Sequence, residues 1–142
     1  MKHQDPTYQK QLVQICQELN EYLMKRFKYK SPPAYITGTG TNIINRPRVK
    51  FSIYLRFFHE RIYNLWPPKT IIIAQLGFRE TRKGNGTHFL SFLKDIALKY
   101  GYEHIGLENT NDESSAFAEH FKFQDLQEKR YYSIAIKELN VS

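Results

Sequence analysis

Cysteine is almost absent from this sequence of 142 residues, in which Cys16 is the only one. A single cysteine excludes an internal disulfide, and the clustered cysteine and histidine ligands of a structural zinc site are missing as well. The histidines are scattered without the spacing of metal ligands, so we predict no metal site and no metal cofactor. Cys16 falls on the apolar side of a predicted helix, where we expect a buried thiol rather than a catalytic one.

Long hydrophobic runs are missing too. No apolar stretch approaches the roughly 20 residues that a membrane-spanning helix needs. Residues 1–6 lack the apolar core of a signal peptide. We therefore expect a soluble, cytoplasmic protein without a membrane partner. We expect it to be either a monomer or a homodimer.

Acidic residues are scarce in the first half of the chain. Residues 1–69 hold 12 Lys and Arg against 4 Asp and Glu, whereas residues 70–142 hold 9 against 10. The basic half indicates either a face that meets an acidic partner or a solvated surface that aids solubility. The length suits one domain over residues 1–142, and an aromatic content of 15% argues against disorder.

The first predicted element is a helix over residues 6–28. Asp5 can cap it, and Pro6 suits its first position, where a missing N–H costs nothing. The Ser-Pro-Pro turn at residues 31–33 is expected to end it. Its buried face is predicted from apolar residues at helical spacing, which are Leu12, Ile15, Leu19, Tyr22 and Leu23.

Strands and helices mix in the rest of the chain. Residues 49–58 alternate apolar and polar side chains, which is typical of a strand with one buried face. Residues 70–78 contain the apolar run Ile71–Ala74, which is typical of a central strand buried on both faces. Further strands are predicted at residues 34–37, 42–45, 103–108 and 131–139, and helices at residues 86–100 and 112–121.

A glycine-containing loop, Arg82-Lys83-Gly84-Asn85-Gly86, joins the central strand to the next helix. The first turn of a helix presents N–H groups without intrahelical partners and a partial positive charge. Glycines let those amides approach a ligand closely, and the two cations add charge. The loop therefore indicates a phosphate site, with an ordinary tight turn as the alternative.

The stretch from Leu76 to Thr87 resembles the central motif of the GNAT acetyltransferases, Gln/Arg-x-x-Gly-x-Gly/Ala after a strand and opening a helix. The chain downstream is similar as well, with Asn111 after the next strand and an aromatic-rich segment from Phe117 to Phe123. The resemblance covers about residues 70–139. It implies an α+β GNAT fold, α/β/α-like, whose twisted sheet is mixed and mostly antiparallel with helices on both faces.

The resemblance also implies acetyl-CoA or another acyl-CoA as cosubstrate. Residues 70–142 would form the acyl-CoA-binding half and residues 1–69 the acceptor-side half. The loop amides would bind the pyrophosphate, and the free edge of the central strand would pair with the pantetheine. The implied cofactor-binding residues are Leu76, Gly77, Phe78, Arg82, Lys83, Gly84, Asn85, Gly86, Thr87 and Asn111.

The implied activity is that of an N-acetyltransferase, in which a neutral amine attacks the thioester directly. Ala118 stands where the family commonly carries the tyrosine that acts as general acid, and Thr70 stands where the histone branch has its glutamate base. Water and proximity can supply part of these roles. The candidate substitutes for catalysis are Glu80, Glu108, Tyr131 and Tyr132.

The resemblance thus implies transfer of an acyl group from acetyl-CoA to a primary amine. Because the acceptor-side half is basic, we expect an acidic or macromolecular acceptor, either a protein or an aminoacyl-RNA. Two alternatives stay open. The chain could be a GNAT-fold binding or regulatory protein with weak or no catalysis, or a basic nucleic-acid-binding module whose affinity falls with salt.

Overall fold

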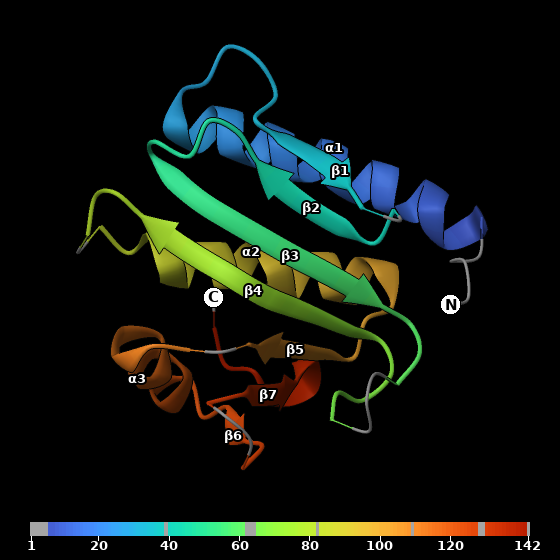
Figure 1. Ribbon diagram of the computed structural model, residues 1–142, viewed down its shortest axis with the longest axis vertical. Helices are drawn as coiled ribbons and strands as arrows, with labels where there is room; N and C mark the ends of the chain where they lie inside the picture. The colour runs from blue at the N-terminus through green and yellow to red at the C-terminus, as the bar shows by residue number, and fades with distance from the viewer. Residues whose placement is uncertain are drawn as a thin grey trace.

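A computed structural model describes residues 6–38, 40–61, 65–81, 83–108, 110–127 and 130–141. Asp5, the predicted helix cap, lies outside these residues. No described helix is long and apolar enough to cross a bilayer. The elements (Figure 1) are α1 Pro6–Phe27, β1 Ala34–Thr37, β2 Asn42–Asn45, β3 Phe51–Phe58, β4 Thr70–Phe78, α2 Asn85–Tyr100, β5 His104–Leu107, α3 Asp112–His120, β6 Gln124–Asp125, β7 Tyr132–Ala135 and a 3₁₀ turn at Ile136–Glu138.

The strands form one seven-stranded sheet in the order β1-β2-β3-β4-β5-β7-β6. Among the described strands, only β4 and β5 pair in parallel, and every other pair is antiparallel. The parallel pair is connected through α2, as a parallel crossover requires. The predicted α+β fold, with a mixed, mostly antiparallel sheet and a strand–loop–helix at its centre, is confirmed.

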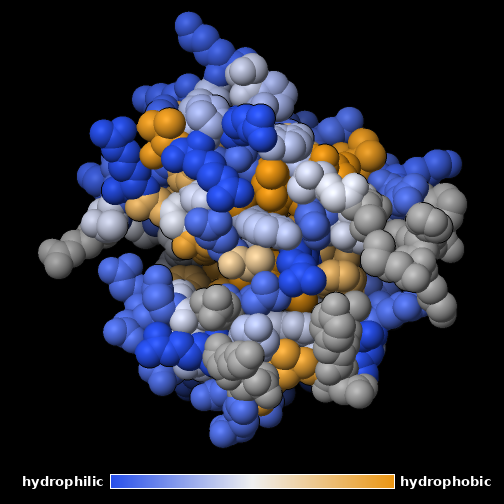
Figure 2. Space-filling view, viewed as in Figure 1, coloured by the Kyte–Doolittle hydropathy of each residue, from blue (hydrophilic) through white to orange (hydrophobic). Residues whose placement is uncertain are grey.

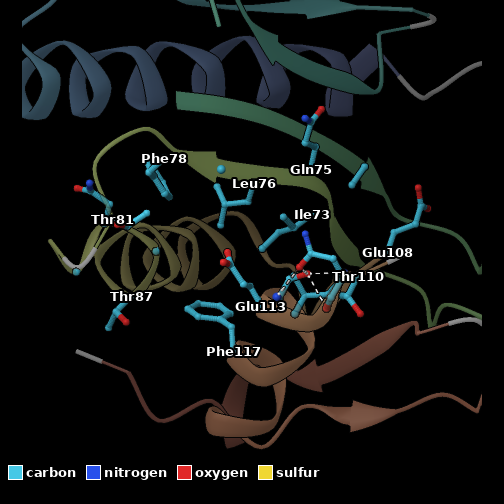
Figure 3. A pocket seen from close by; sticks show the side chains of 18 of the residues that line it. Ile73, Gln75, Leu76, Phe78, Thr81, Thr87, Glu108, Thr110, Glu113 and Phe117 are labelled. Atoms are coloured by element: carbon cyan, nitrogen blue, oxygen red, sulfur yellow. Dashed lines mark hydrogen bonds between the residues drawn. The ribbon is translucent and has the colours of Figure 1, made fainter. Parts of the chain in front are cut away.

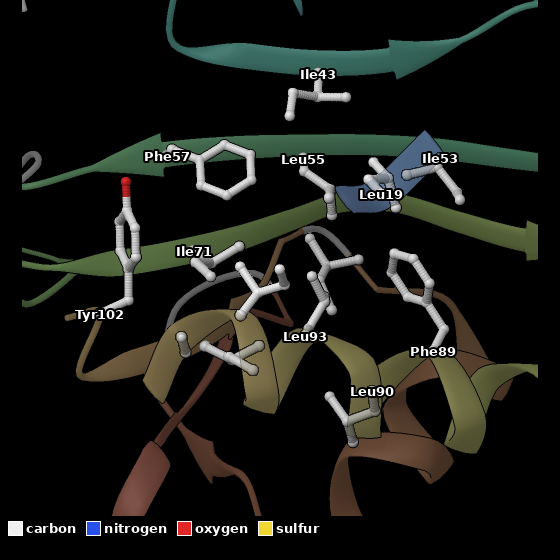
Figure 4. Packing of buried hydrophobic residues seen from close by; sticks show 14 of the residues in the cluster. Leu19, Ile43, Ile53, Leu55, Phe57, Ile71, Phe89, Leu90, Leu93 and Tyr102 are labelled. Atoms are coloured by element: carbon white, nitrogen blue, oxygen red, sulfur yellow. The ribbon is translucent and has the colours of Figure 1, made fainter. Parts of the chain in front are cut away.

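Helices α1 and α2 lie on the same side of strands β1 to β4 (Figure 1). The alternation predicted for β3 is confirmed, because every second side chain from Phe51 to Phe57 is buried. These side chains and those of Ile71 and Ile73 belong to one hydrophobic cluster, which also takes in the apolar faces of both helices (Figure 4). The members from the helices include Leu12, Ile15, Leu19, Leu23, Phe89, Leu90, Leu93 and Ile96.

The last predicted strand, residues 131–139, is wrong beyond Ala135. There the chain turns into the 3₁₀ element, whose Ile136 N–H donates to the Glu103 carbonyl oxygen at 2.8 Å. Ile136 and Leu139 are both buried, although they lie three residues apart. A flat strand would place these two side chains on opposite faces, so burying both favours the turn.

Gly106 lies where an indole ring presses on the sheet. A Cβ at this position would clash with Cζ3 of Trp66, a side chain that is 2% exposed. We therefore expect Gly106→Ala to lower the free energy of unfolding by about 1–3 kcal/mol, the usual cost of overpacking. Urea unfolding followed by circular dichroism measures it. Gly77→Ala is the control, because its Cβ would meet nothing within 4 Å. Equal midpoints for the two variants would contradict the prediction.

Candidate active site

Strand β4 separates from β5 halfway along its length. The two strands pair from Thr70 opposite His104 to Ile73 opposite Leu107. The Glu108 N–H then donates to the Ile73 carbonyl oxygen at 3.1 Å, while β4 continues to Phe78. The register with β3 shifts at the same point, because Ala74 has no partner there. Such a bulge bends the strand, so β4 has a free edge from Ala74 onward.

The hydrogen bonds to β3 decide which backbone groups this edge presents. The Arg79 N–H donates to the Lys50 carbonyl oxygen at 2.9 Å. Because backbone groups alternate between the two sides of a strand, those of Gly77 also face β3. The N–H and C=O groups of Leu76 and Phe78 therefore face the free side, about 6.6 Å apart along the strand. Gly77 lines the same space without offering its polar backbone groups to it.

The loop that follows β4 leads into an uncapped helix. Gly84 is the N-cap residue of α2, with a left-handed φ of 72° and no side-chain cap. A residue with a side chain would be strained in this conformation. Gly86 and Thr87 lie in the first turn, where N–H groups lack intrahelical partners. Lys83 is exposed beside them, and Arg82 lies outside the described residues.

The side chain of Asn85 holds this loop in place. Its Oδ1 accepts a hydrogen bond from Nε of Arg26 in α1 at 2.9 Å, and its Nδ2 donates to the Glu80 carbonyl oxygen at 3.3 Å. Both of its polar atoms are thus engaged within the protein. Its backbone N–H lies in the first turn of α2, where such groups lack intrahelical partners. Sequence reasoning could not supply this role, since Arg26 lies 59 residues away.

The free edge and the helix start line one cleft of about 460 Å³ between β4, α2 and α3. Figure 2 shows the molecule hollowed at this place, with apolar atoms deep inside, and Figure 3 shows the side chains around it. Asn111 lines the cleft, and its Oδ1 also caps α3 by accepting from the Ser114 N–H at 2.9 Å. Among the lining residues that sequence reasoning missed are Thr110, Glu113, Ser114 and Phe117, which lie in α3 or just before it.

Two of the four candidate catalytic residues line the cleft, and the other two do not. Glu108 stands where β5 leaves β4, at one end, whereas Glu80 stands beside the loop at the other. Tyr131 stacks on Trp66 with ring centroids 5.6 Å apart. Tyr132 is 7% exposed and belongs to the hydrophobic cluster, so both tyrosines have packing roles.

Glu108 forms an ion pair across the sheet. Its Oε2 accepts from Nη1 of Arg56 in β3 at 2.7 Å, and the two side chains are only 22% and 26% exposed. The Arg56 guanidinium also lies over the Phe58 ring, 5.2 Å from its centroid. A charge-assisted pair of this kind fixes the carboxylate's orientation. The partners are 52 residues apart, so only the sheet register reveals them.

The two positions that the resemblance aligns with catalytic side chains, the general acid of the family and the base of the histone branch, are both buried. Ala118 is completely buried in α3. Thr70 is also completely buried, and its hydroxyl donates to the Pro67 carbonyl oxygen at 2.7 Å. Neither residue lines the cleft. Within the described part of the chain, no group of three His, Cys, Asp or Glu residues could hold a metal ion.

No protein-family model matches the sequence, and no curated protein matches it. The chain is, however, similar to solved structures. The chain is similar to AtaTR bound with acetyl-CoA, with 15% identity over 68% of this chain and 66% of that one and a TM-score of 0.48. It is also similar to GCN5 of Tetrahymena, with 12% identity over 99% and 94% of the two chains and a TM-score of 0.47. The resemblance is one of architecture.

Proposed function

We propose that the cleft binds acyl-CoA and that the protein transfers the acyl group to an amine. One observation carries the proposal. The unpaired edge of β4 leads along a single cleft to the uncapped start of α2. An extended edge suits a linear chain of amides, and a helix start suits a phosphate. Together with the sequence motif, this order of sites matches the pantetheine and pyrophosphate of coenzyme A.

In this proposal the two amides of the pantetheine hydrogen-bond with the backbone groups of Leu76 and Phe78, as an added strand would. The pyrophosphate lies on the N–H groups of Gly86 and Thr87, where the helix dipole favours negative charge. Phe117 forms the opposite wall, since a Cβ on Gly86 would stand 3.4 Å from its ring. Lys83 and Arg82 add positive charge at the loop.

The thioester then lies at the Glu108 end of the cleft. A neutral amine attacks the carbonyl carbon, the C–N bond forms, the C–S bond breaks, and coenzyme A leaves as a thiolate that takes a proton from solvent. We propose that Glu108 accepts the proton of the attacking amine and that Arg56 positions its carboxylate. Glu80 suits this role less, because it stands at the phosphate end.

The acceptor enters, in this proposal, past β3, which places the residue 1–69 half on the acceptor side. One observation favours a second candidate function. Because Ala118 and Thr70 are buried and carry no acid or base, the chain could bind acyl-CoA as a regulatory module without turnover. Glu108 is the feature that distinguishes the two functions, and its substitution is taken up in the Discussion.

Calorimetric titration with acetyl-CoA tests the binding step. We expect acetyl-CoA to bind. We expect pantetheine alone and adenosine 3′,5′-bisphosphate alone to bind at least about 100-fold more weakly, a loss of about 2.7 kcal/mol of binding free energy each. Each fragment occupies only one of the two subsites. Absence of heat with a folded protein, shown by a cooperative unfolding transition, would overturn the proposal. If adenosine 3′,5′-bisphosphate bound as tightly as acetyl-CoA, the pantetheine would contribute no affinity, and the edge of β4 would be removed from the proposed site.

A further inference from the structure

Eight exposed cations gather at one end of the molecule. There α1 ends, the β2–β3 connection turns, and β4 gives way to the loop before α2 (Figure 1). We call this surface the basic end. Its cations are Lys25, Lys28, Lys30, Arg46, Arg48, Lys50, Arg79 and Lys83.

Direct contacts hold the three segments of the basic end together. Nζ of Lys50 donates to the Phe27 carbonyl oxygen at 2.6 Å, which links the β2–β3 connection to the end of α1. The Arg79 N–H donates to the Lys50 carbonyl oxygen at 2.9 Å. The rings of Phe27 and Phe78 stack with centroids 5.9 Å apart. The cations therefore share one surface rather than three separate ones.

The charge of the basic end is not neutralised by the protein. Across residues 25–30, 46–50 and 79–83, Glu80 is the only acid. None of the eight cations forms an ion pair with a carboxylate in the described part of the chain. Coenzyme A carries only roughly four negative charges. The basic end thus holds more positive charge than the ligand of the cleft would match.

The surface chemistry indicates which anion fits. Three large hydrophobic side chains are exposed among the described residues, and of these only Val49 lies at the basic end. Protein interfaces have an apolar core, and membrane-surface segments insert apolar side chains. Interfaces with nucleic acids are instead polar and strongly positive. The basic end matches the last kind.

The aromatic residues at this end are already covered. The Lys50 ammonium lies 4.9 Å from the centroid of the Tyr29 ring, and the Arg46 guanidinium lies 5.6 Å from that of Tyr35. Both tyrosines are half-buried. Their rings therefore offer no open platform on which bases could stack. The cations of this surface would therefore contact phosphates, which carry no information about the base sequence.

We propose that the basic end binds the phosphate backbone of a nucleic acid, independently of base sequence. This surface is additional to acyl transfer and does not depend on it. The proposal explains why the positive charge concentrates in residues 1–69 although the cleft is built mainly from residues 73–117.

Fluorescence anisotropy with a labelled RNA hairpin, at several salt concentrations, tests the proposal. The variant combines Lys25→Gln, Lys30→Gln and Arg79→Gln, whose side chains make no hydrogen bond or ion pair to the described residues. The matched control combines Lys10→Gln, Arg61→Gln and Lys137→Gln, all exposed and outside the three segments. We expect the variant to bind about 30-fold more weakly and its log–log salt slope to fall by about three. The control should stay within about twofold of the native protein.

Four outcomes would overturn the proposal. The native protein could fail to bind the hairpin at low salt, or the control could lose as much affinity as the variant. Coenzyme A could displace the hairpin completely, which would assign these cations to the ligand of the cleft. Anionic phospholipid vesicles could bind where the hairpin does not, which would make the partner a membrane surface. Binding of acetyl-CoA is measured separately, so failure here leaves the proposed function standing.

Discussion

Gly86→Glu is expected to raise the dissociation constant of acetyl-CoA at least about 100-fold, or about 2.7 kcal/mol. Gly86 lies in the first turn of α2, and its missing side chain leaves the space between that turn and Phe117. A glutamate would fill this space and place a carboxylate where the pyrophosphate is proposed to lie. The carboxylate and the pyrophosphate would then repel each other. Calorimetric titration of the purified variant measures the loss.

Two variants separate this effect from damage to the helix. Leu98→Glu adds the same charge to α2 at a position 63% exposed, outside the cleft, and should bind acetyl-CoA as the native protein does. Gly86→Ala adds only a methyl group and should lose affinity to a smaller extent, while gaining up to about 1 kcal/mol of helix propensity. Unchanged affinity in Gly86→Glu would place the anion elsewhere and remove the helix start from the proposed site.

Glu108→Gln is expected to lower kcat/KM for acetyl transfer by roughly 100-fold, the lower range for loss of a general base. Glutamine keeps the shape of the side chain and can still accept a hydrogen bond from Arg56, but it cannot take a proton from the attacking amine. The affinity for acetyl-CoA should stay unchanged, because in the proposed mechanism the carboxylate contacts the acceptor rather than the cosubstrate. Thiol release from acetyl-CoA, with the most active amine of a panel of amino acids, polyamines and peptides, measures the rate.

Glu80→Gln is the matched control for this change. It alters the other cleft carboxylate in the same way, but at the phosphate end, and should leave the rate within about threefold. A rate in Glu108→Gln equal to that of the native protein would show that Glu108 has a structural role. If the native protein shows no transfer to any amine while binding acetyl-CoA, the regulatory alternative replaces the enzyme.

Much of the secondary structure could be predicted because its signals are local. The helical spacing from Leu12 to Leu23, the alternation in β3 and the apolar run in β4 each lie within one element and depend on its own period. The end of α2 was equally local, since Gly101 takes the left-handed φ of 81° that ends a helix. The 3₁₀ turn at Ile136–Glu138 was missed because its cause is a hydrogen bond to distant Glu103.

In the candidate site, too, the local features could be predicted from the sequence and the contacts between distant segments could not. The sequence by itself determined the loop, its glycines and its charge, since the strand, the loop and the helix are contiguous in the chain. Only the tertiary structure decided which groups face the cleft. The ion pair of Glu108 with Arg56, the clamp of Asn85 by Arg26 and the packing role of Tyr132 depend on sheet register and helix contact between distant segments. Local periodicity carries no information about such pairs. Two distant segments bury each other's side chains and pair their charges only once the elements have packed together.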